Sequence, residues 1–405
     1  MGVGAGWPDG SCCGTDGGGA SLACRRSNAD SRSSDVPYSA ISGEDWTAAV
    51  IASAGAGPIS DCGARSRVQA TGVGAPVSDS TVTTSGKGAN GVFATDTGSS
   101  IDLKNVTIQA SADGAHGVMA TDGGSLTLNN VDITTSGGSS SAIATDRGGG
   151  TITVQGGRVR TSGGNSAGIY STGTITVTNG TFIATGAEAA VIEGANSITL
   201  TDTSLSSSKA GKWGVMIYQS MSGDAQGTQG LFTMSGGALT DSATDGPLFY
   251  VTNSTGVINL KGVKAQAASG TLVKAASGYW GSSGFNGGTV LLTADGQTLN
   301  GNLVADALSS ITVNLKNGSA LTGAINAAKT AKEANLTLDA SSSWTVTADS
   351  YLSSLSDAAG ISGSTFTNIR GNGHTVYYDA SLAASRSLGG KTYDLFGGGT
   401  LKPLP

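Results

Sequence analysis

The chain has 405 residues, of which 65 are glycine, 12% are charged and only 5% are aromatic. Its net charge of −6 argues against nucleic acid as a partner, because phosphate backbones are bound by basic patches. Gly, Ser, Thr, Asn and Val in short alternating runs argue against helical and leucine-rich repeats. They indicate many short strands joined by tight turns.

Residues 1–64 differ in composition from the rest of the chain and contain all four cysteines, Cys12, Cys13, Cys24 and Cys62. Their spacing is not that of a zinc site, and no apolar run is long enough for a signal peptide or a membrane helix. A disulfide-stapled cap or a metal site stays open, but the composition favours a disordered or non-native leader. We expect no metal, no cofactor and no membrane insertion.

A six-residue phrase then recurs, as "GVFATD" from Gly91, "GVMATD" from Gly117 and "SAIATD" from Ser141, at spacings of 26 and 24 residues. Weaker copies continue as far as residue 302. A period in the twenties is the signature of a solenoid, in which each repeat forms one coil. We expect the third residue of each phrase to stack into one interior column: Phe93, Met119, Ile143, Tyr170, Ile192, Met216 and Phe249.

A second repeated segment follows each phrase, as "IDLKNVTI" (101–108), "LTLNNVDI" (126–133) and "ITVQGGRV" (152–159). Apolar residues occupy its first, third and eighth positions, and a polar or glycine pair between them bends the chain. Each coil therefore carries three short strands. The sequence predicts an all-β, right-handed parallel β-helix over residues 65–345, with about 24 residues per coil.

The period is lost after residue 345, and the segment 346–405 is richer in aromatic residues. A solenoid needs a terminal cap that covers the apolar face and the open strand edges of its last coil. We therefore predict a C-terminal capping region here, with its aromatic residues as the cover: Tyr351, Tyr377, Tyr378, Tyr393 and Phe396.

The coil length, the Ser/Thr/Gly/Asn-rich strands and phrases such as "LTLNNVDI" resemble secreted bacterial right-handed parallel β-helix proteins. The nearest groups are autotransporter passenger domains and adhesins, with pectate-lyase-like polysaccharide enzymes more distant. The resemblance implies a secreted or cell-surface protein that binds a polysaccharide or surface glycan. No catalytic residue is carried over, because the calcium signature of a pectate lyase is absent from the sequence.

The sixth position of the first three phrases holds an aspartate, Asp96, Asp122 and Asp146 in turn. If stacked at the strand spacing, these carboxylates would repel one another, bind a cation or pair with Arg147. The alternative is that each aspartate ends a strand and shapes the glycine-rich turn that follows it. We favour that alternative.

The middle coils depart most from the repeat. The longest spacings hold insertions, "QSMSGDAQGTQG" (219–230) and "ASGYWGSSGFNGG" (276–288), and inserted loops build the binding face of a solenoid. Aromatic faces beside amides and charged groups suit a sugar. The predicted substrate-binding residues are Arg147, Lys212, Trp213, Tyr218, Gln219, Asp224, Tyr250 and Trp280.

A polysaccharide-cleaving enzyme, either a glycoside hydrolase or a lyase, is the alternative function. Asp146 and Glu193 would lie two coils apart, about 9–10 Å along the axis, close to the roughly 6.5–9.5 Å carboxyl separation of an inverting glycosidase. With Glu188 they form the predicted catalytic set. A solvated face with incidental aromatic residues also stays open.

Phrases such as "TITV" and "LTLT" raise a further function, ice binding on a flat threonine array. In the repeat register assumed above, the threonines scatter between faces. The sequence therefore predicts no clean threonine column.

Overall fold

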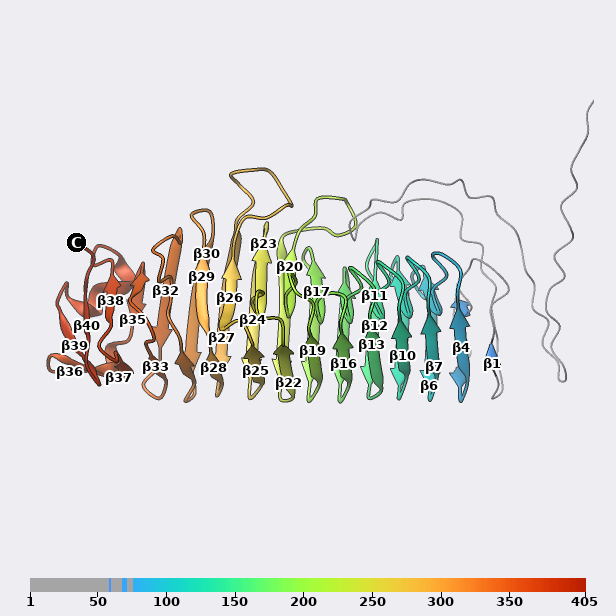
Figure 1. Cartoon of the computed structure of the whole chain (residues 1–405), viewed down its shortest axis with the longest axis horizontal. Helices are drawn as coiled ribbons and strands as arrows, with labels where there is room; N and C mark the ends of the chain where they lie inside the picture. Colours follow the sequence, from blue (N-terminus) through green and yellow to red (C-terminus); the bar gives the residue numbers. More distant parts are fainter. Residues whose placement is uncertain (1–57, 60–67, 71–75) are drawn as a thin grey trace, which may run out of the picture.

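The computed structural model describes residues 58–59, 68–70 and 76–405. They form an all-β parallel solenoid of about 13 turns with roughly 25 residues per turn. Figure 1 shows an elongated rod whose strands stack along its long axis, with the C-terminus at one end. The predicted fold class is confirmed. The expectations for Cys12, Cys13, Cys24 and Cys62 lie outside the described residues.

Three parallel sheets, here called A, C and B in the order in which each coil visits them, form the walls of the solenoid. Sheet A consists of β2 (Val68–Ala70), β5 (Val92–Thr95), β8 (Val118–Thr121), β11 (Ile143–Thr145), β14 (Ile169–Ser171), β17 (Ala190–Glu193), β20 (Val215–Tyr218), β23 (Phe249–Thr252), β26 (Thr271–Ala275) and β29 (Asn302–Ala305). Sheet C consists of β3 (Val77–Ser78), β6 (Ser100–Lys104), β9 (Ser125–Asn129), β12 (Thr151–Gln155), β15 (Thr174–Thr178), β18 (Ser197–Thr201), β21 (Gln229–Ser235), β24 (Ser254–Lys261), β27 (Gly288–Asp295), β30 (Ser310–Lys316), β32 (Glu333–Leu338) and β35 (Ser354–Ser356). Sheet B consists of β1 (Pro58–Ile59), β4 (Thr81–Thr84), β7 (Thr107–Ala110), β10 (Asp132–Thr135), β13 (Arg158–Thr161), β16 (Thr181–Ala184), β19 (Ser204–Ser207), β22 (Ala238–Asp241) and β25 (Lys264–Ala267).

The core lies inside these walls, and in sheets B and C it follows the predicted register. Apolar residues alternate with polar ones, so each inward residue stacks on its equivalent in the next coil, as Ile101 does on Leu126 and Ile108 on Ile133. The corner between the two sheets is turned by a residue with a left-handed backbone, such as Asn105 at φ 53°. These predictions are confirmed.

Sheet A has a different register from the one that the phrases predict. Met119 pairs with Ala144 rather than with Ile143, and Tyr170 pairs with Val191 rather than with Ile192. A slip of one residue moves a side chain to the opposite face of a sheet. The predicted interior column is therefore wrong as a single column: Ile143, Ile192 and Phe249 do point into the core, but Phe93, Met119, Tyr170 and Met216 lie on the outer face. The inward column is Val92, Val118, Ile143, Ile169, Ala190, Val215 and Phe249, and the outward one is Phe93, Met119, Ala144, Tyr170, Val191, Met216 and Tyr250.

The outer face of sheet C carries the threonine column that the sequence did not predict. From β9 to β32 the strands pair without a bulge, which keeps one outward position in line. Its members, all exposed or half-exposed, are Thr127, Thr153, Thr176, Thr199, Thr233, Asn259, Thr293, Asn314 and Thr337. The neighbouring column, from Ser125 through Thr151 and Thr174 to Asn335, is also free of charged residues.

A mixed sheet, here called sheet D, closes the C-terminal end. In spatial order it consists of β28 (Thr298–Asn300), β31 (Ala320–Thr322), β33 (Ser343–Thr345), β37 (Thr365–Arg370), β39 (Tyr393–Phe396), β40 (Thr400–Pro403), β38 (Thr375–Tyr378) and β34 (Ser350–Leu352). A short strand, β36 (Ile361–Ser362), pairs with β37. Two short helices, η1 (Ala358–Gly360) and η2 (Ala383–Leu388), connect strands of this region. Of the predicted covering residues, Tyr378 and Tyr393 are buried, whereas Phe396 is 54% exposed. Tyr351 and Tyr377 stack on each other with ring centroids 4.8 Å apart.

Candidate functional site

One edge of the solenoid, here called the A–C edge, collects all the connections that lead from sheet A to sheet C. Near the N-terminal end these connections are short turns, such as residues 122–124 between β8 and β9. Two of them are long loops, 219–228 after β20 and 276–287 after β26. Both rise beyond the strand ends on the same side of the rod (Figure 1). The insertions found in the sequence therefore lie on a single edge.

A groove of about 460 Å³ runs along this edge across five successive coils. Its length is therefore on the order of 20 Å, since neighbouring coils are about 4.8 Å apart. Glycines form much of its lining, and at Gly150 a Cβ would lie only 2.7 Å from the carbonyl oxygen of Ala120. Hydroxyl and amide side chains complete it: Thr151, Thr174, Asn196, Ser197 and Gln229.

A hydrogen-bonded network ties loop 219–228 to sheet A beside the groove. The Glu193 carboxylate accepts bonds from the hydroxyls of Tyr170, Tyr218 (2.7 Å) and Ser220. The Ser220 Oγ lies 2.6 Å from that of Ser222, which donates to Asp224 at 2.9 Å. The Arg147 Nε in turn donates to Asp224 Oδ1 at 2.6 Å. This ion pair joins loop 219–228 to the turn after β11 that lines the groove.

The structure does not present Glu193 or Glu188 to a substrate, since both side chains are 0% exposed. Glu193 ends β17, and its oxygens are bonded within the network. Glu188 precedes the start of the same strand and forms an ion pair with Lys212, Nζ to Oε1 3.4 Å. Lys212 also donates to Asn165 at 2.9 Å. The predicted catalytic residues are thus not gathered at one accessible point.

Asp146 is a partly exposed carboxylate next to the groove, two residues before Gly148, and the exposed Asp122 directly precedes Gly123 of the lining. Burial raises its pKa from 3.8 to about 6; the backbone N–H of Arg147 opposes this rise, and the nearby charges of Asp224 and Glu193 add to it. The three aspartates do not form one stack, because Thr145 pairs with Ala120 and the register therefore leaves Asp146 out of line with Asp122. The favoured alternative, in which the aspartates end strands and shape the turns, agrees with the structure at Asp96 and Asp122. Asp96 and Asp122 are exposed residues of turns, with φ of 74° and 49°.

The raised pKa of Asp146 predicts a pH dependence of stability. The native state holds the proton more tightly than the unfolded chain does, so the contribution of Asp146 to stability grows as the pH falls from about 7 to about 4. We expect the melting temperature of the wild type to rise relative to that of Asp146→Asn as the pH is lowered from about 7 to about 4. Thermal unfolding of both proteins in matched buffers measures the difference. A difference that stays constant with pH would contradict the prediction.

The predicted aromatic residues meet on the outer face of sheet A. Trp213 stacks on Tyr250 with ring centroids 4.2 Å apart, and Trp280 lies 5.4 Å from Tyr218. Tyr218 and Tyr250 are buried, while the two tryptophans are half-buried. These four residues form a cluster, here called the aromatic cluster, at the base of the two long loops. Only its two tryptophans are partly accessible to solvent.

Gln219 and Asp224, also predicted to bind substrate, are buried within loop 219–228. The Gln219 amide donates to the carbonyl oxygens of Ala225 and Gly227 and accepts from the N–H of Met221. The structure therefore places both residues where they hold the loop in shape.

Three large apolar side chains on the two loops are exposed, Met221 (70%), Tyr279 (86%) and Phe285 (89%). The aromatic residues of the second inserted segment, which include Tyr279 and Phe285, were predicted from the sequence to face a sugar, whereas Met221 was not predicted. Tyr279 packs edge-on against Trp280, centroids 5.0 Å apart, which connects the exposed surface to the buried aromatic cluster. The signal available in the sequence was the insertion, because insertions in a solenoid project outward.

No protein family, no curated protein and no solved structure matches this chain. Across residues 58–59, 68–70 and 76–405, no group of three or more His, Cys, Asp or Glu side chains is placed to hold a metal ion. None of the helices in the described part of the chain has the length and apolar character needed to cross a membrane.

Proposed function

We propose that this protein binds a polysaccharide or surface glycan along the A–C edge. One observation carries the proposal: the groove, loop 219–228 and loop 276–287 share this edge, and the loops expose Met221, Tyr279 and Phe285. Sugar rings present flat apolar faces that stack on aromatic rings, and their hydroxyls bond to hydroxyl and amide groups such as those of the groove. A long groove suits a chain of sugars.

Binding without cleavage is the function that we propose. An inverting glycosidase needs two carboxyl groups that flank the scissile bond. Here Asp146 is partly exposed, but Glu193 and Glu188 are fully buried and engaged with other side chains. A secreted or cell-surface, adhesin-like role follows from the resemblance to bacterial β-helix proteins and is part of the same proposal.

Replacing Tyr279 and Phe285 together by alanine should weaken glycan binding at least tenfold. Each aromatic ring that stacks on a sugar ring should contribute about 0.5–1.5 kcal/mol beyond the area that it buries, as stacked aromatic pairs do. Co-sedimentation with a panel of insoluble polysaccharides and a glycan array measure it. Phe396→Ala is the matched control, since Phe396 is an exposed aromatic residue on sheet D. Unchanged binding in the double variant, or release of reducing ends by the wild type, would overturn the proposal.

The threonine column on sheet C supports a second candidate function, the binding of ice. Polar side chains, most of them threonines with a hydroxyl and a methyl group, repeat there every 4.8 Å or so from β9 to β32, and neither this column nor the adjacent one contains a charged residue. Such an array can hold first-shell water in a repeating arrangement, as polar groups on proteins order bridging water. A partner that contacts all of these threonines at once must itself be rigid and regularly spaced, as the surface of an ice crystal is.

Thr176→Lys should abolish most of any ice-growth inhibition, because it places a charged, flexible side chain within the run of five consecutive threonines. Thr181→Lys is the matched control, since Thr181 lies on the exposed face of sheet B in the same coil. Thermal hysteresis and ice recrystallisation assays measure the effect. Absence of activity in the wild type, or equal activity in both variants, would rule this function out.

A further inference from the structure

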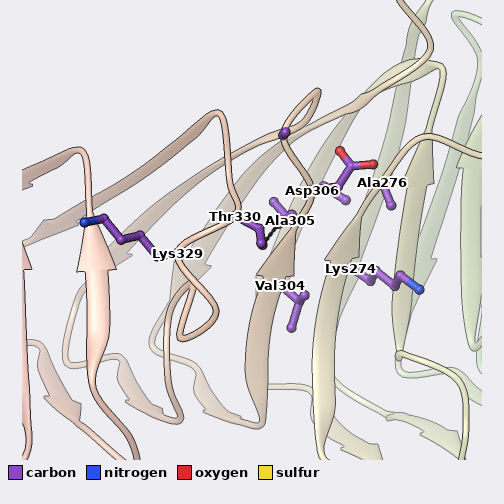
Figure 2. A pocket seen from close by; sticks show the side chains of 9 residues that line it. Lys274, Ala276, Val304, Ala305, Asp306, Lys329 and Thr330 are labelled. Carbon is purple, nitrogen blue, oxygen red and sulfur yellow. Dashed lines mark hydrogen bonds between the residues drawn. The ribbon is translucent and has the colours of Figure 1, made fainter. Parts of the chain in front are cut away.

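A second cavity lies on the outer face of sheet A, beyond the aromatic cluster and at the base of loop 276–287. It measures about 410 Å³. Lys274 of β26 and Val304 of β29, which are paired neighbours, contribute to its lining. Ala276, at the start of the loop, lines the cavity and also packs in the hydrophobic cluster that contains Tyr218 and Tyr250. Figure 2 shows Lys274 and Lys329 at opposite sides of the cavity with their ammonium groups directed away from it, and Asp306 between them, so both stems must swing inward to reach one ligand.

The turn that carries Lys329 is firmly built. Its centre is Asn326, a buried side chain whose Oδ1 accepts the backbone N–H groups of Thr330 (2.9 Å) and Ala331 (3.0 Å). The Thr330 hydroxyl donates to the carbonyl oxygen of Ala305 at 2.6 Å, which fixes the turn to β29. Lys329 itself has φ of 54°, a left-handed conformation that costs free energy in a lysine and persists because its surroundings impose it.

The charges around the cavity leave a positive excess. Asp306 is buried enough to raise its pKa, but the hydrogen bonds that it accepts, two of them from Ser277, outweigh this and hold its pKa below the usual value. It therefore stays ionised, with its oxygens already engaged. In the described part of the chain, neither Lys274 nor Lys329 has a carboxylate within ion-pair distance, and the Lys329 Nζ lies 5.4 Å over the ring of Tyr351.

A ligand for this cavity needs an apolar body and a negative charge. The surfaces of Val304 and Ala276 suit the ring of a sugar, and the flexible lysine stems can bring their ammonium groups to a carboxylate. Because the chain carries a net charge of −6, an anion is attracted only where lysines gather locally. The cavity adjoins loop 276–287, on which the proposed glycan site depends, through Ala276 and the Ser277–Asp306 hydrogen bonds.

We infer that this cavity is a subsite for an acidic sugar, so that the glycan bound along the A–C edge carries uronate carboxylates. The inference rests on the proposed function and narrows its ligand class. The carboxylate binds to Lys274 and Lys329, while its ring packs on Val304 and Ala276 and a neighbouring sugar reaches Tyr279. Asp306 keeps its hydrogen bonds to Ser277 and excludes a second carboxylate from the centre of the cavity.

The test compares hyaluronan with the same polymer after chemical reduction of its carboxyl groups. The wild type should bind the native polymer at least tenfold more tightly, and this preference should weaken as salt is added. Lys274→Met together with Lys329→Met keeps the apolar stems and should remove the preference while leaving the binding of the reduced polymer unchanged. Lys264→Met, an exposed lysine on sheet B, is the control for the loss of one charge.

The outcomes separate this inference from the proposed function. If both polymers bind equally and Tyr279→Ala weakens both, the glycan site stands and the acidic subsite is wrong. If the preference survives in the double lysine variant, the subsite is also wrong. If neither polymer binds to the wild type, both ideas fail for this ligand class.

Discussion

Replacement of Glu193 by alanine should lower the free energy of unfolding by roughly 3–5 kcal/mol, because several hydroxyl groups lose their acceptor at once. The carboxylate is fully buried and accepts the hydroxyls of Tyr170, Tyr218 and Ser220. Without it, these donors lose their acceptor, and each unsatisfied buried group costs about 1–3 kcal/mol. Burial of a carboxyl group itself costs free energy, so its removal offsets part of this cost and the total is less than the sum over the donors.

Loop 219–228 should respond first, because Ser220 connects Glu193 to the Ser222–Asp224–Arg147 part of the network. We expect faster proteolysis within this loop in Glu193→Ala at temperatures well below the melting temperature. Circular dichroism and limited proteolysis together measure the two effects, since the coils of a solenoid need not unfold in one step.

Two matched variants identify the cause. Glu193→Gln keeps the shape and one acceptor oxygen and should cost about 1–3 kcal/mol, whereas Tyr218→Phe removes a single donor and leaves the other two in place. If Glu193→Ala proved as stable as the wild type, the carboxylate would be free of a structural role. Its assignment to catalysis would then regain support.

The difference between sheets B and C, where the register was predictable, and sheet A, where it was not, has a physical basis. In sheets B and C one face is apolar and the other is polar or exposed, so the alternation identifies the inward residues. In sheet A both faces are buried at strands such as β20, "VMIY", and β23, "FYVT". Alternation then carries no information about the face, and a slip of one residue passes unnoticed in the sequence.

The candidate site was predictable to the extent that it depends on loop length. Two long spacings in the repeat identified the loops and the edge that they occupy. The role of Glu193 was hidden, because its partners Tyr170 and Ser220 come from another coil and from an inserted loop, and only the register brings them together. Lys274 and Lys329 gave no signal either, since both look like ordinary surface lysines until the fold places them around one cavity.

Replacement of Trp344 by alanine should have an effect of similar size, a loss of about 3–5 kcal/mol, as is usual for a fully buried tryptophan. Trp344 is among the largest fully buried side chains of the described part of the chain, and its Nε1–H donates to the carbonyl oxygen of Gly323 at 2.9 Å. It pairs with Leu321 on one side and Ile369 on the other. Trp344 thus lies on β33 between β31 and β37, in the row of strands by which sheet D runs from the coils to the C-terminal strands.

Loss of this connection should also change how the protein associates. Opening of sheet D would leave unpaired strand edges at the C-terminal end, and exposed edges of this kind pair with other chains. We expect Trp344→Ala to form concentration-dependent oligomers, measured by size-exclusion chromatography with light scattering alongside thermal unfolding. Trp344→Phe keeps most of the volume and loses only the hydrogen bond, so it should stay monodisperse and cost about 1–3 kcal/mol.

Phe396→Ala supplies the contrast within the same sheet, because Phe396 is 54% exposed and surface substitutions usually change stability by less than about 0.5 kcal/mol. If Trp344→Ala destabilised the protein no more than Phe396→Ala, sheet D would not be coupled to the solenoid through the indole. If it destabilised the protein strongly without association, the mixed sheet would contribute to stability but not protect the edge. Capping in the full sense requires both results, since a solenoid end must be packed against its last coil and also closed to further strands.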